Sequence, residues 1–248
     1  MDPFVEACIR ANEEIFKTIE AGFDASWFEK TEVGAGGDVS SRLDLFAESV
    51  FVKHLSTFGF IESEESGIIG EGDAHIIIDP IDGSANALSR FPYYGTSVAR
   101  VNADGVLDAA IVCNLANGDI FIKTPGMSLK QGKLFDMQLH KAATVPVAEI
   151  GLFEKAYANP ELVAQLDASG LKFRAPGAIA LSLAYAHSVK FVLFAGVFRI
   201  YDFAAGLALC EGLEVVVEQD YVIVSKEKSV VETIVGIIVE ARRMQEEV

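Results

Sequence analysis

The segment HIIIDPIDGSAN, residues 75–86, limits the possible folds of this chain more than any other. Its run of isoleucines is typical of a buried strand, and two acids, Asp79 and Asp82, follow on either side of Pro80. Because proline has no N–H to donate to a neighbouring strand, we expect the strand to end at Pro80. The next two residues, a glycine and a serine, stand at the start of a predicted helix. A strand of the hydrophobic core therefore leads directly into a turn that carries two carboxylates.

Two structures fit this turn. Unpaired N–H groups at a helix start bind anions, and hard cations such as Mg²⁺ take carboxylates and substrate phosphate as ligands. On this interpretation the segment is half of a metal-bridged phosphate site. In the alternative, Asp82 caps the helix and Asp79 lies in a turn at the surface, which is ordinary turn chemistry. For the segment taken alone, the capped turn is the more common structure.

Acids elsewhere in the chain change this comparison. Glu64 and Glu65 lie just upstream in ESEESG, and Asp202 follows an apolar strand and begins a predicted helix. Each of these acids taken alone is typical of solvated charge or of a helix cap. Together with Asp79 and Asp82, they supply enough oxygen ligands for a centre of two or three metal ions.

Composition excludes several classes of function. The 36 acidic residues outnumber the 20 lysines and arginines, and the net charge of −16 repels a phosphate backbone, so we expect no nucleic-acid partner. The three cysteines are far apart without CxxC spacing, which argues against a disulfide framework and a zinc site. The acidic N-terminal segment is unlike a signal peptide, and the most apolar stretch, FVLFAGVF, is too short to span a membrane. We therefore expect a cytoplasmic protein without a membrane partner.

Hydrophobic patterning divides the chain into two halves. The pattern predicts a helix over about residues 1–20, a mobile glycine-rich loop over 31–44, and a helix that begins near Ser40 or Ser41 and ends at about 58. It then predicts strands over 74–79, 95–101, 105–114 and 118–124, followed by a hairpin. From residue 149 onward, short strands alternate with helices. The first half is therefore α+β and the second half α/β, with the boundary between about residues 136 and 148.

Three segments, ESEESG, IDPIDGSAN and YDFAAG, resemble in this order the signature segments of the inositol monophosphatase superfamily. The loop VGAGGDVSSRLDLFAES, the tract FRAPGAIAL and the arginine in FRIYDFAAG resemble its archaeal-type branch of dual inositol monophosphatase/fructose-1,6-bisphosphatase enzymes. The resemblance implies a layered αβαβα sandwich over residues 1–248, working as a single catalytic unit. It further implies a lobe over 1–140 for metal and phosphate and a lobe over 141–248 for substrate.

The resemblance also implies roles for individual residues. The implied metal ligands are Glu64, Asp79, the backbone carbonyl of Ile81, Asp82 and Asp202, with Asp38 and Glu65 near a weaker third metal. The implied catalytic residues are Asp44, Ser84 and Glu64, of which Ser84 and Asp44 would orient the attacking water. The expected substrate-binding residues are Gly83, Ser84, Arg174, Gly177, Ala178 and Arg199. For Arg174 and Arg199, a surface ion pair is an equally good interpretation.

The implied activity is Mg²⁺-dependent hydrolysis of inositol monophosphate, fructose-1,6-bisphosphate or both, by a homodimer of carbohydrate metabolism and gluconeogenesis. Two or three Mg²⁺ ions would activate the water, and Mn²⁺ is a possible replacement. Inositol-specific members carry a glutamate seven residues before the helix-opening aspartate, where this chain has Ala195, which favours a broader range of sugar or polyol phosphates. Two alternatives remain: a 3′-phosphonucleotide phosphatase, and a non-catalytic regulatory member that binds metal or phosphate.

Overall fold

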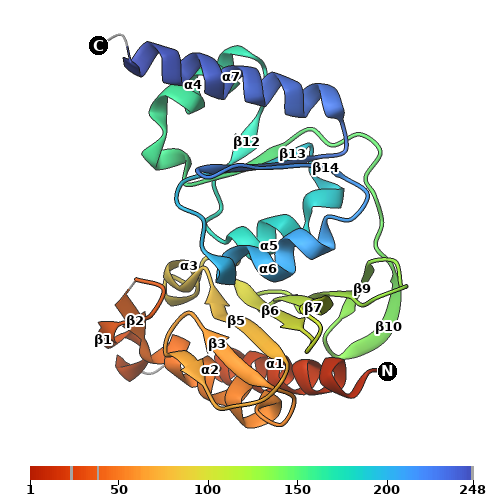
Figure 1. Ribbon diagram of the computed structural model, residues 1–248. Helices are drawn as coiled ribbons and strands as arrows, with labels where there is room; N and C mark the ends of the chain where they lie inside the picture. Colours follow the sequence, from red (N-terminus) through yellow and green to blue (C-terminus); the bar gives the residue numbers. More distant parts are fainter. Residues whose placement is uncertain (23–24, 38, 247–248) are drawn as a thin grey trace. The chain divides into compact units, whose positions relative to one another are not determined.

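A computed structural model describes residues 1–22, 25–37 and 39–246 of the 248-residue chain (Figure 1). The chain forms two compact units. The first unit comprises Met1–Ala142, Ala178–Leu181 and Arg199–Leu209, and the second comprises Ala143–Gly177, Ser182–Phe198 and Cys210–Val248. Two later segments thus return to the first unit. That the chain works as one catalytic unit with lobes over 1–140 and 141–248 stays a prediction.

An eight-stranded sheet forms the centre of the first unit, in the order β10-β9-β8-β7-β6-β5-β3-β4. Every neighbouring pair is antiparallel except β3 and β5, which are parallel. The strands are β3 (Phe60–Ser63), β4 (Gly67–Ile69), β5 (His75–Asp82), β6 (Gly95–Val101), β7 (Leu107–Asn114), β8 (Asp119–Lys123), β9 (Lys130–Lys133) and β10 (Asp136–Lys141). The antiparallel strands and hairpin predicted between residues 95 and 135 are therefore confirmed.

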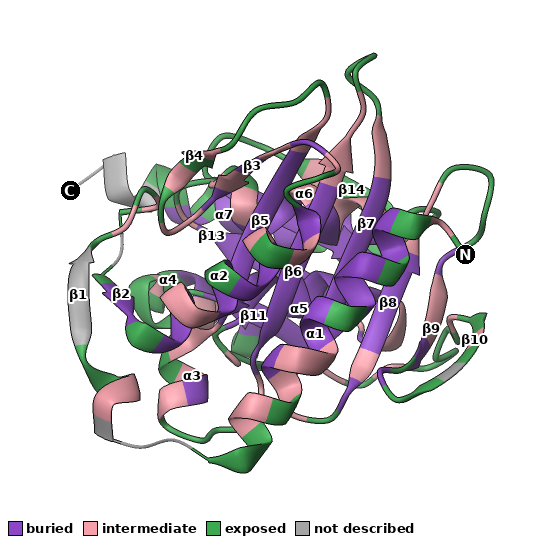
Figure 2. Cartoon of the chain, turned by 90° about the horizontal axis from the view of Figure 1, so that it is seen from below, coloured by how far each residue is buried: buried purple, intermediate pink, exposed green. Residues whose placement is uncertain are grey.

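Two long helices pack on one face of this sheet. Helices α1 (Pro3–Ala21) and α2 (Arg42–Leu55) bury Phe4, Ile15 and Phe51 against isoleucines of β5 and β7. Figure 2 shows both helices lying across the buried strands. Helix α6 (Ile200–Leu209) packs against β5, β6 and β7, and Figure 1 shows it on the opposite face from α1 and α2. The sheet is thus covered by helices on both faces, so its central strands are buried on both sides.

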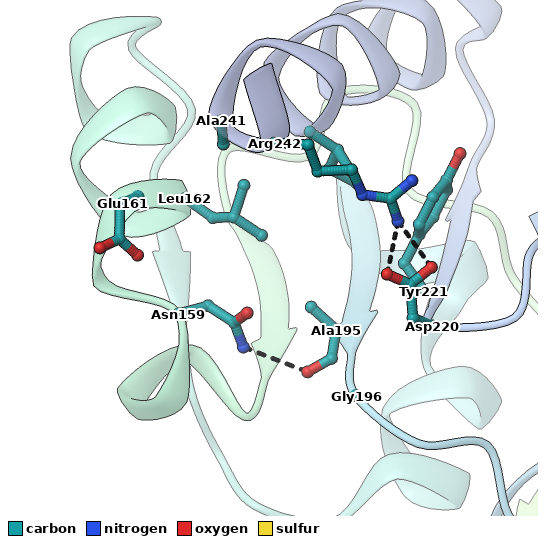
Figure 3. A pocket seen from close by; sticks show the side chains of 10 residues that line it. Asn159, Glu161, Leu162, Ala195, Gly196, Asp220, Tyr221, Ala241 and Arg242 are labelled. Carbon is teal, nitrogen blue, oxygen red and sulfur yellow. Dashed lines mark hydrogen bonds and ion pairs between the residues drawn. The ribbon is translucent and has the colours of Figure 1, made fainter. Parts of the chain in front are cut away.

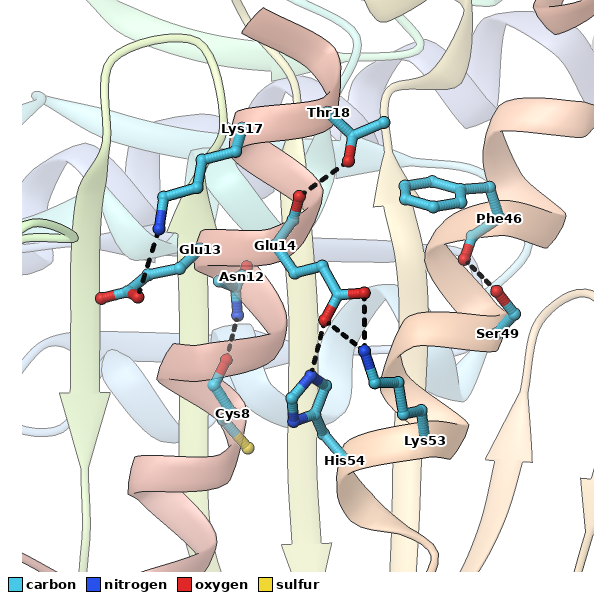
Figure 4. Close-up of polar contacts among 10 residues, drawn as sticks. All are labelled: Cys8, Asn12, Glu13, Glu14, Lys17, Thr18, Phe46, Ser49, Lys53 and His54. Atoms are coloured by element: carbon cyan, nitrogen blue, oxygen red, sulfur yellow. Dashed lines mark hydrogen bonds and ion pairs between the residues drawn. The ribbon is translucent and has the colours of Figure 1, made fainter. Parts of the chain in front are cut away.

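An ion-pair cluster joins the two helices (Figure 4). The Glu14 carboxylate on α1 accepts from Lys53 Nζ at 2.8 and 2.9 Å and contacts His54 Nε2 at 2.9 Å, both on α2. The hydrogen bonds from Lys53 and His54 lower the pKa of Glu14 below its usual value. A second polar contact links α1 to the sheet: Thr96 Oγ1 donates to Asn12 Oδ1 at 2.6 Å. Both residues are fully buried. These contacts fix the position of α1 against α2 and the sheet.

Three predicted element boundaries are wrong. Strand β5 does not end at Pro80 but continues to Asp82, because its ladder with β6 shifts register between Asp79 and Asp82 and a missing proline N–H is tolerated at such a bulge. The glycine-rich loop contains a hairpin of β1 (Lys30–Val33) and β2 (Val39–Ser41), since the glycines occupy only its turn. Helix α2 has the predicted N-cap, Ser41, but ends at Leu55 rather than near residue 58.

The second unit has a five-stranded sheet in the order β12-β11-β13-β15-β14. Helices α4 and α7 pack together, and α7 also packs on β14 and β15. The predicted alternation of strands and helices after residue 148 is confirmed. The elements are β11 (Gly151–Glu154), α4 (Pro160–Ala168), β12 (Phe173–Arg174), β13 (Phe191–Ala195), β14 (Glu214–Val217), β15 (Tyr221–Ser225) and α7 (Lys228–Glu246). The remaining helices are η1 (Ala25–Phe28), α3 (Ser84–Leu88), η2 (Ala156–Ala158), α5 (Ile179–Ala184) and η3 (Ala186–Ser188).

Candidate metal and phosphate site

Three carboxylates gather in the first unit. Glu64, Asp79 and Asp202 each offer an oxygen, and these oxygens lie within 4.8 Å of one another. Glu64 follows β3, Asp79 lies on β5, and Asp202 lies in the first turn of α6. Asp79 and Asp202 are buried, each with 3% of its surface exposed, while Glu64 is half-buried. Five ligands were predicted for the two main metal ions, four carboxylates and one backbone carbonyl. Segments far apart in the sequence bring three of these carboxylates together in one cluster.

The bulge in β5 determines where Asp82 points. Asp79 pairs with Ser97 and Asp82 pairs with Gly95, which lie two residues apart on β6. Because side chains alternate between faces with a period of two, Asp79 and Asp82 share one face of the sheet. Ile81 faces the opposite way, into the core beneath α1 and α2. The bulge therefore turns two acids at an odd spacing toward the same site.

The surroundings of Asp79 disfavour its ionised form unless a cation lies nearby. Its pKa is raised well above the ordinary value, first by burial and then by the negative charges around it. These charges, in decreasing order of effect, are Glu64, Asp82, Asp202 and Asp44. A buried group of ionised carboxylates is unfavourable unless cations neutralise it. The donors are all hard oxygens, which is the set that Mg²⁺ prefers, so these residues fit a magnesium centre.

Arg199 contacts the same carboxylates. It lies just before α6, and its Nη1 lies 2.8 Å from Glu64 Oε1. Its Nε donates to Asp202 Oδ2 at 2.9 Å, and its Nη2 donates to Asp202 Oδ1 at 3.3 Å. The predicted substrate cation is thus an ion-pair partner of two predicted metal ligands, and it is partly buried, with 24% of its side chain exposed.

Ser84 and Asp44 form a hydrogen-bonded pair beside the cluster. Ser84 Oγ lies 2.6 Å from Asp44 Oδ1, to which it donates, and 3.0 Å from the backbone carbonyl of Ile81. The other oxygen of Asp44 accepts from the backbone N–H and the hydroxyl of Ser41, each at 2.7 Å, in a capping box at the start of α2. Asp44 therefore belongs to a rigid helix start and holds the Ser84 hydroxyl in a fixed direction.

The structure contradicts the capped-turn interpretation of residues 79–84. The N-cap of α3 is Gly83, whose φ of +88° favours glycine, and not Asp82. The Asp82 carboxylate instead accepts from the backbone N–H of Leu181 at 2.7 Å. Asp79 is buried rather than at the surface. The five-residue helix α3 begins at Ser84, so the roles predicted for Gly83 and Ser84 in holding phosphate stay predictions.

The glycine-rich turn lies against the acidic pair at residues 64–65. Ala35 N–H donates to Glu65 O at 2.9 Å, and Gly36 N–H donates to Glu64 O at 2.7 Å. Ser40 Oγ donates to the Glu65 carboxylate. Asp38, the predicted ligand of a third metal, lies outside the described residues. The described part of this turn thus supports the main chain of Glu64 and Glu65.

The remaining predicted substrate residues divide between the units. Arg174, at the end of β12, is exposed and donates from Nη1 to Phe173 O at 2.8 Å. Gly177, with a φ of +85°, donates its N–H to Glu154 at 2.9 Å. Both belong to the second unit, whereas Ala178 is buried and belongs to the first. Their binding roles stay predictions.

Sequence reasoning missed Glu154, a buried acid beside the predicted substrate segment. Glu154 is 3% exposed and accepts from Gly177 N–H at 2.9 Å and from Ser182 Oγ at 2.5 Å. It therefore braces the main chain of the predicted substrate segment from within the second unit. Its signal was an acid at the end of the apolar strand GLFE, the same signal that identified Asp79.

A separate cavity of about 200 Å³ lies within the second unit (Figure 3). Its lining includes Ala195, Asn159 and Arg242. Arg242 Nη2 is paired with the Asp220 carboxylate at 2.5 and 2.6 Å, and Asn159 donates to Ala195 O at 3.1 Å. Because its charged and polar groups are largely engaged with one another, we assign this cavity no function.

The cysteines do not supply a nucleophile for the site. All three cysteines, Cys8, Cys113 and Cys210, are buried thiols, as expected from the lack of a disulfide pattern. Burial raises their pKa values, that of Cys210 to about 12, so they are poor nucleophiles.

Among the described residues, no helix has the length and apolar character needed to cross a membrane.

Comparisons with known proteins find named phosphatases among the relatives of this chain. The chain is 29% identical to the bifunctional NADP phosphatase/NAD kinase of Methanocaldococcus jannaschii, over 77% of this chain but only 40% of that protein. It is also 29% identical to the fructose-1,6-bisphosphatase/inositol-1-monophosphatase of Archaeoglobus fulgidus, over 72% of this chain and 69% of that protein. The chain thus spans about two fifths of the length of the former relative, so the activities of that whole protein are not transferred.

The fold is that of solved inositol monophosphatases. The structure of the Thermotoga maritima IMPase superposes with a TM-score of 0.77 at 20% identity, covering 97% of this chain and all of that one. The predicted layered sandwich of the inositol monophosphatase/fructose-1,6-bisphosphatase type is therefore confirmed. The predicted resemblance is also confirmed, because the sequence profile of the family matches residues 1–219. The chain belongs to the inositol monophosphatase family.

Proposed function

We propose that this chain is a Mg²⁺-dependent phosphoric monoester hydrolase that acts on sugar or polyol phosphates. Its substrates would be inositol monophosphate, fructose-1,6-bisphosphate or both. The observation that carries the proposal is the meeting of Glu64, Asp79 and Asp202 within 4.8 Å, beside the hydrogen-bonded pair of Ser84 and Asp44. Membership of a family whose relatives include named phosphatases supports the same reaction.

The acidic residues would hold the metal. Glu64, Asp79, Asp82, Asp202 and the carbonyl of Ile81 are the proposed ligands of two ions, with Asp38 and Glu65 near a third. Mn²⁺ would use the same oxygen donors. When bound, such ions lower the pKa of bound water and neutralise charge on the leaving oxygen. Phosphate monoesters hydrolyse extremely slowly without such help.

The protein's own groups would position the attacking water. The Ser84 hydroxyl donates its hydrogen bond to Asp44, so its lone pairs would be available to accept a hydrogen bond from water. That contact turns a lone pair of the water toward the phosphorus atom. Asp44 cannot rotate away, because its second oxygen is held by the Ser41 backbone N–H and hydroxyl. Orientation of this kind contributes through the entropy saved in the bound geometry.

Other groups would bind the substrate. The N–H groups of Gly83 and Ser84 are the proposed phosphate donors, and Arg174 and Arg199 are the proposed cations for the rest of the molecule. Gly177 and Ala178 would lie close to the sugar. Ala195 replaces a glutamate of inositol-specific relatives, which favours a broad range of substrates. We further propose a cytoplasmic homodimer that works in carbohydrate metabolism, including gluconeogenesis.

Phosphate release in the presence of Mg²⁺ tests the proposal. The panel contains inositol-1-phosphate, fructose-1,6-bisphosphate, NADP⁺ and adenosine 3′,5′-bisphosphate, and each substrate is assayed with Mg²⁺, with Mn²⁺ and with EDTA. Turnover of the first two, lost in EDTA, is expected. Turnover of NADP⁺ alone would instead match the phosphatase named in the Methanocaldococcus relative, and turnover of the adenosine bisphosphate alone would favour a 3′-phosphonucleotide phosphatase. No turnover of any substrate would favour a regulatory member.

A further inference from the structure

The acidic cluster contacts a cation that belongs to the chain itself. Three nitrogens of Arg199 lie within 3.3 Å of carboxylate oxygens, one on Glu64 and both on Asp202. These two acids belong to the trio whose oxygens meet within 4.8 Å. The guanidinium therefore occupies ligand atoms that a metal ion in this cluster would also use.

We propose that Arg199 is the counter-ion of the cluster in the metal-free protein, and that Mg²⁺ binding requires its guanidinium to leave Glu64 and Asp202. The proposal rests on the metal site of the proposed function. It assigns to Arg199 the control of metal affinity, because each metal ion must compete with a cation that is covalently tethered beside its ligands. Once displaced, the same guanidinium is one of the two cations that we assign to the substrate.

Competition follows from the shared oxygens and from charge. Both oxygens of Asp202 accept hydrogen bonds from Arg199, so on each oxygen the lone pair that faces Arg199 is already used and fewer directions remain for a metal. Mg²⁺ demands nearly octahedral oxygen ligands at short distances and tolerates little misalignment. In addition, a guanidinium and a divalent ion repel each other, and salt screens this repulsion less at a partly buried site than at the open surface.

The position of Arg199 in the chain permits the movement. Helix α6 begins at the following residue, Ile200, and residues 196–199 have no helix or strand structure. The side chain can therefore swing out without breaking a helical hydrogen bond. Its contact with the Gly36 carbonyl, at 3.4 Å, is long and offers little resistance. A rotamer change of this partly exposed side chain would release both acids.

The proposal predicts that replacing Arg199 lowers the stability of the metal-free protein and at the same time tightens Mg²⁺ binding. Without Arg199, the metal-free protein keeps an unneutralised acidic cluster and loses stability. The same loss makes Mg²⁺ binding tighter, since no tethered cation has to be displaced. An arginine that only packed against the site would change stability equally with and without metal.

The experiment compares Arg199→Met with Arg42→Met. Arg42 has the same charge, but it pairs at the surface with Glu29 at 2.7 Å, with both side chains more than half exposed. After EDTA treatment and its removal, Mg²⁺ is titrated calorimetrically, and Tm is measured with EDTA and with saturating Mg²⁺. For Arg199→Met we expect a Kd for Mg²⁺ that is about tenfold lower, or lower still, and a fall in Tm that is larger in EDTA than in Mg²⁺. Arg42→Met should change the Kd by less than about twofold.

Each other outcome overturns a defined part of the proposal. An unchanged or higher Kd in Arg199→Met, with wild type binding Mg²⁺, removes the role of Arg199 alone. An equal fall in Tm with and without Mg²⁺ does the same. Absence of Mg²⁺ binding by both proteins overturns the proposed metal site and the counter-ion role with it. Arg199→Lys keeps the charge but loses the planar fork, so its Kd should lie between those of wild type and Arg199→Met.

Discussion

Asp79 and Asp82 lie on the same face of strand β5 although they are three positions apart in the sequence. They pair with Ser97 and Gly95, two residues apart on β6, because a bulge at Pro80 and Ile81 adds one residue to β5. In a regular strand the second acid would point into the core beneath α1 and α2. The bulge therefore makes a two-carboxylate site out of a segment that would otherwise bury a charge among apolar side chains.

Asp82→Asn tests this pairing of acids. An asparagine has nearly the same shape, and its side-chain oxygen can still accept from the Leu181 N–H that Asp82 binds at 2.7 Å. The fold should therefore persist, while the site loses one negative charge and a metal ligand. We expect phosphatase activity to fall on the order of 100-fold. Circular dichroism and phosphate release check the two expectations, and full activity would show that Asp82 is not a ligand.

Ser84→Ala tests the positioning of water. The substitution removes the hydroxyl that donates to Asp44 at 2.6 Å, but Asp44 keeps its contacts with Ser41, so α2 should stay capped. We expect kcat to fall on the order of 100-fold with little change in KM. Ser49→Ala is a matched control, since that exposed hydroxyl donates only to Phe46 O within α2 (Figure 4). Equal kcat values for the two variants would exclude the proposed role of Ser84.

Gly36→Ala tests the support of Glu64 by the glycine-rich turn. A Cβ at Gly36 would lie 2.5 Å from Glu64 Cγ and 2.9 Å from its Oε1, so the carboxylate must move. The Mg²⁺ concentration for half-maximal activity should rise about tenfold, as it does when groups that orient metal ligands are disturbed. Gly236→Ala in helix α7 is the control, because an added Cβ there would meet no atom within 4 Å beyond its chain neighbours and the backbone of its own helix. An unchanged Mg²⁺ requirement in Gly36→Ala would argue against Glu64 as a ligand.

The ion pairs of Glu14 should make part of the unfolding free energy depend on pH. Its pKa is lowered by the hydrogen bonds from Lys53 and His54, so its contribution is complete above the pKa of an unfolded glutamate and disappears as pH falls through the lower folded value. Glu14→Gln should cost about 0.5–1 kcal/mol of unfolding free energy at pH 7, the range for exposed pairs, and less in acid.

Urea unfolding across this pH range measures the effect. Glu13→Gln is the neighbouring control, because Glu13 pairs only with Lys17 on its own helix at 3.9 Å (Figure 4). Its effect should stay within about 0.5 kcal/mol at all pH values. A deficit in Glu14→Gln that persists unchanged in acid would contradict the ionic origin of the contact between α1 and α2.

Much of the chain is readable from local pattern. Helical periodicity predicts α1, and the capping residue Ser41 predicts the start of α2. The alternation of strand and helix patterns after residue 148 predicts the order of elements in the second unit. These features depend on neighbours in sequence, which is why periodicity and capping residues predict them. The acids that meet in the cluster are also identifiable, because each directly follows an apolar strand or opens a helix at a signature segment.

Tertiary structure decided the rest. The continuation of β5 past Pro80 depends on its register with β6, and a bulge is a property of two strands rather than one. The contact of Arg199 with Glu64 and Asp202 depends on α6 returning to the first unit, more than a hundred residues after β3. The sequence by itself determined which residues can bind a metal or a phosphate, since that is a matter of side-chain chemistry. Only the folded chain decided which of them face each other, because pairing and packing between distant segments set the direction of every side chain.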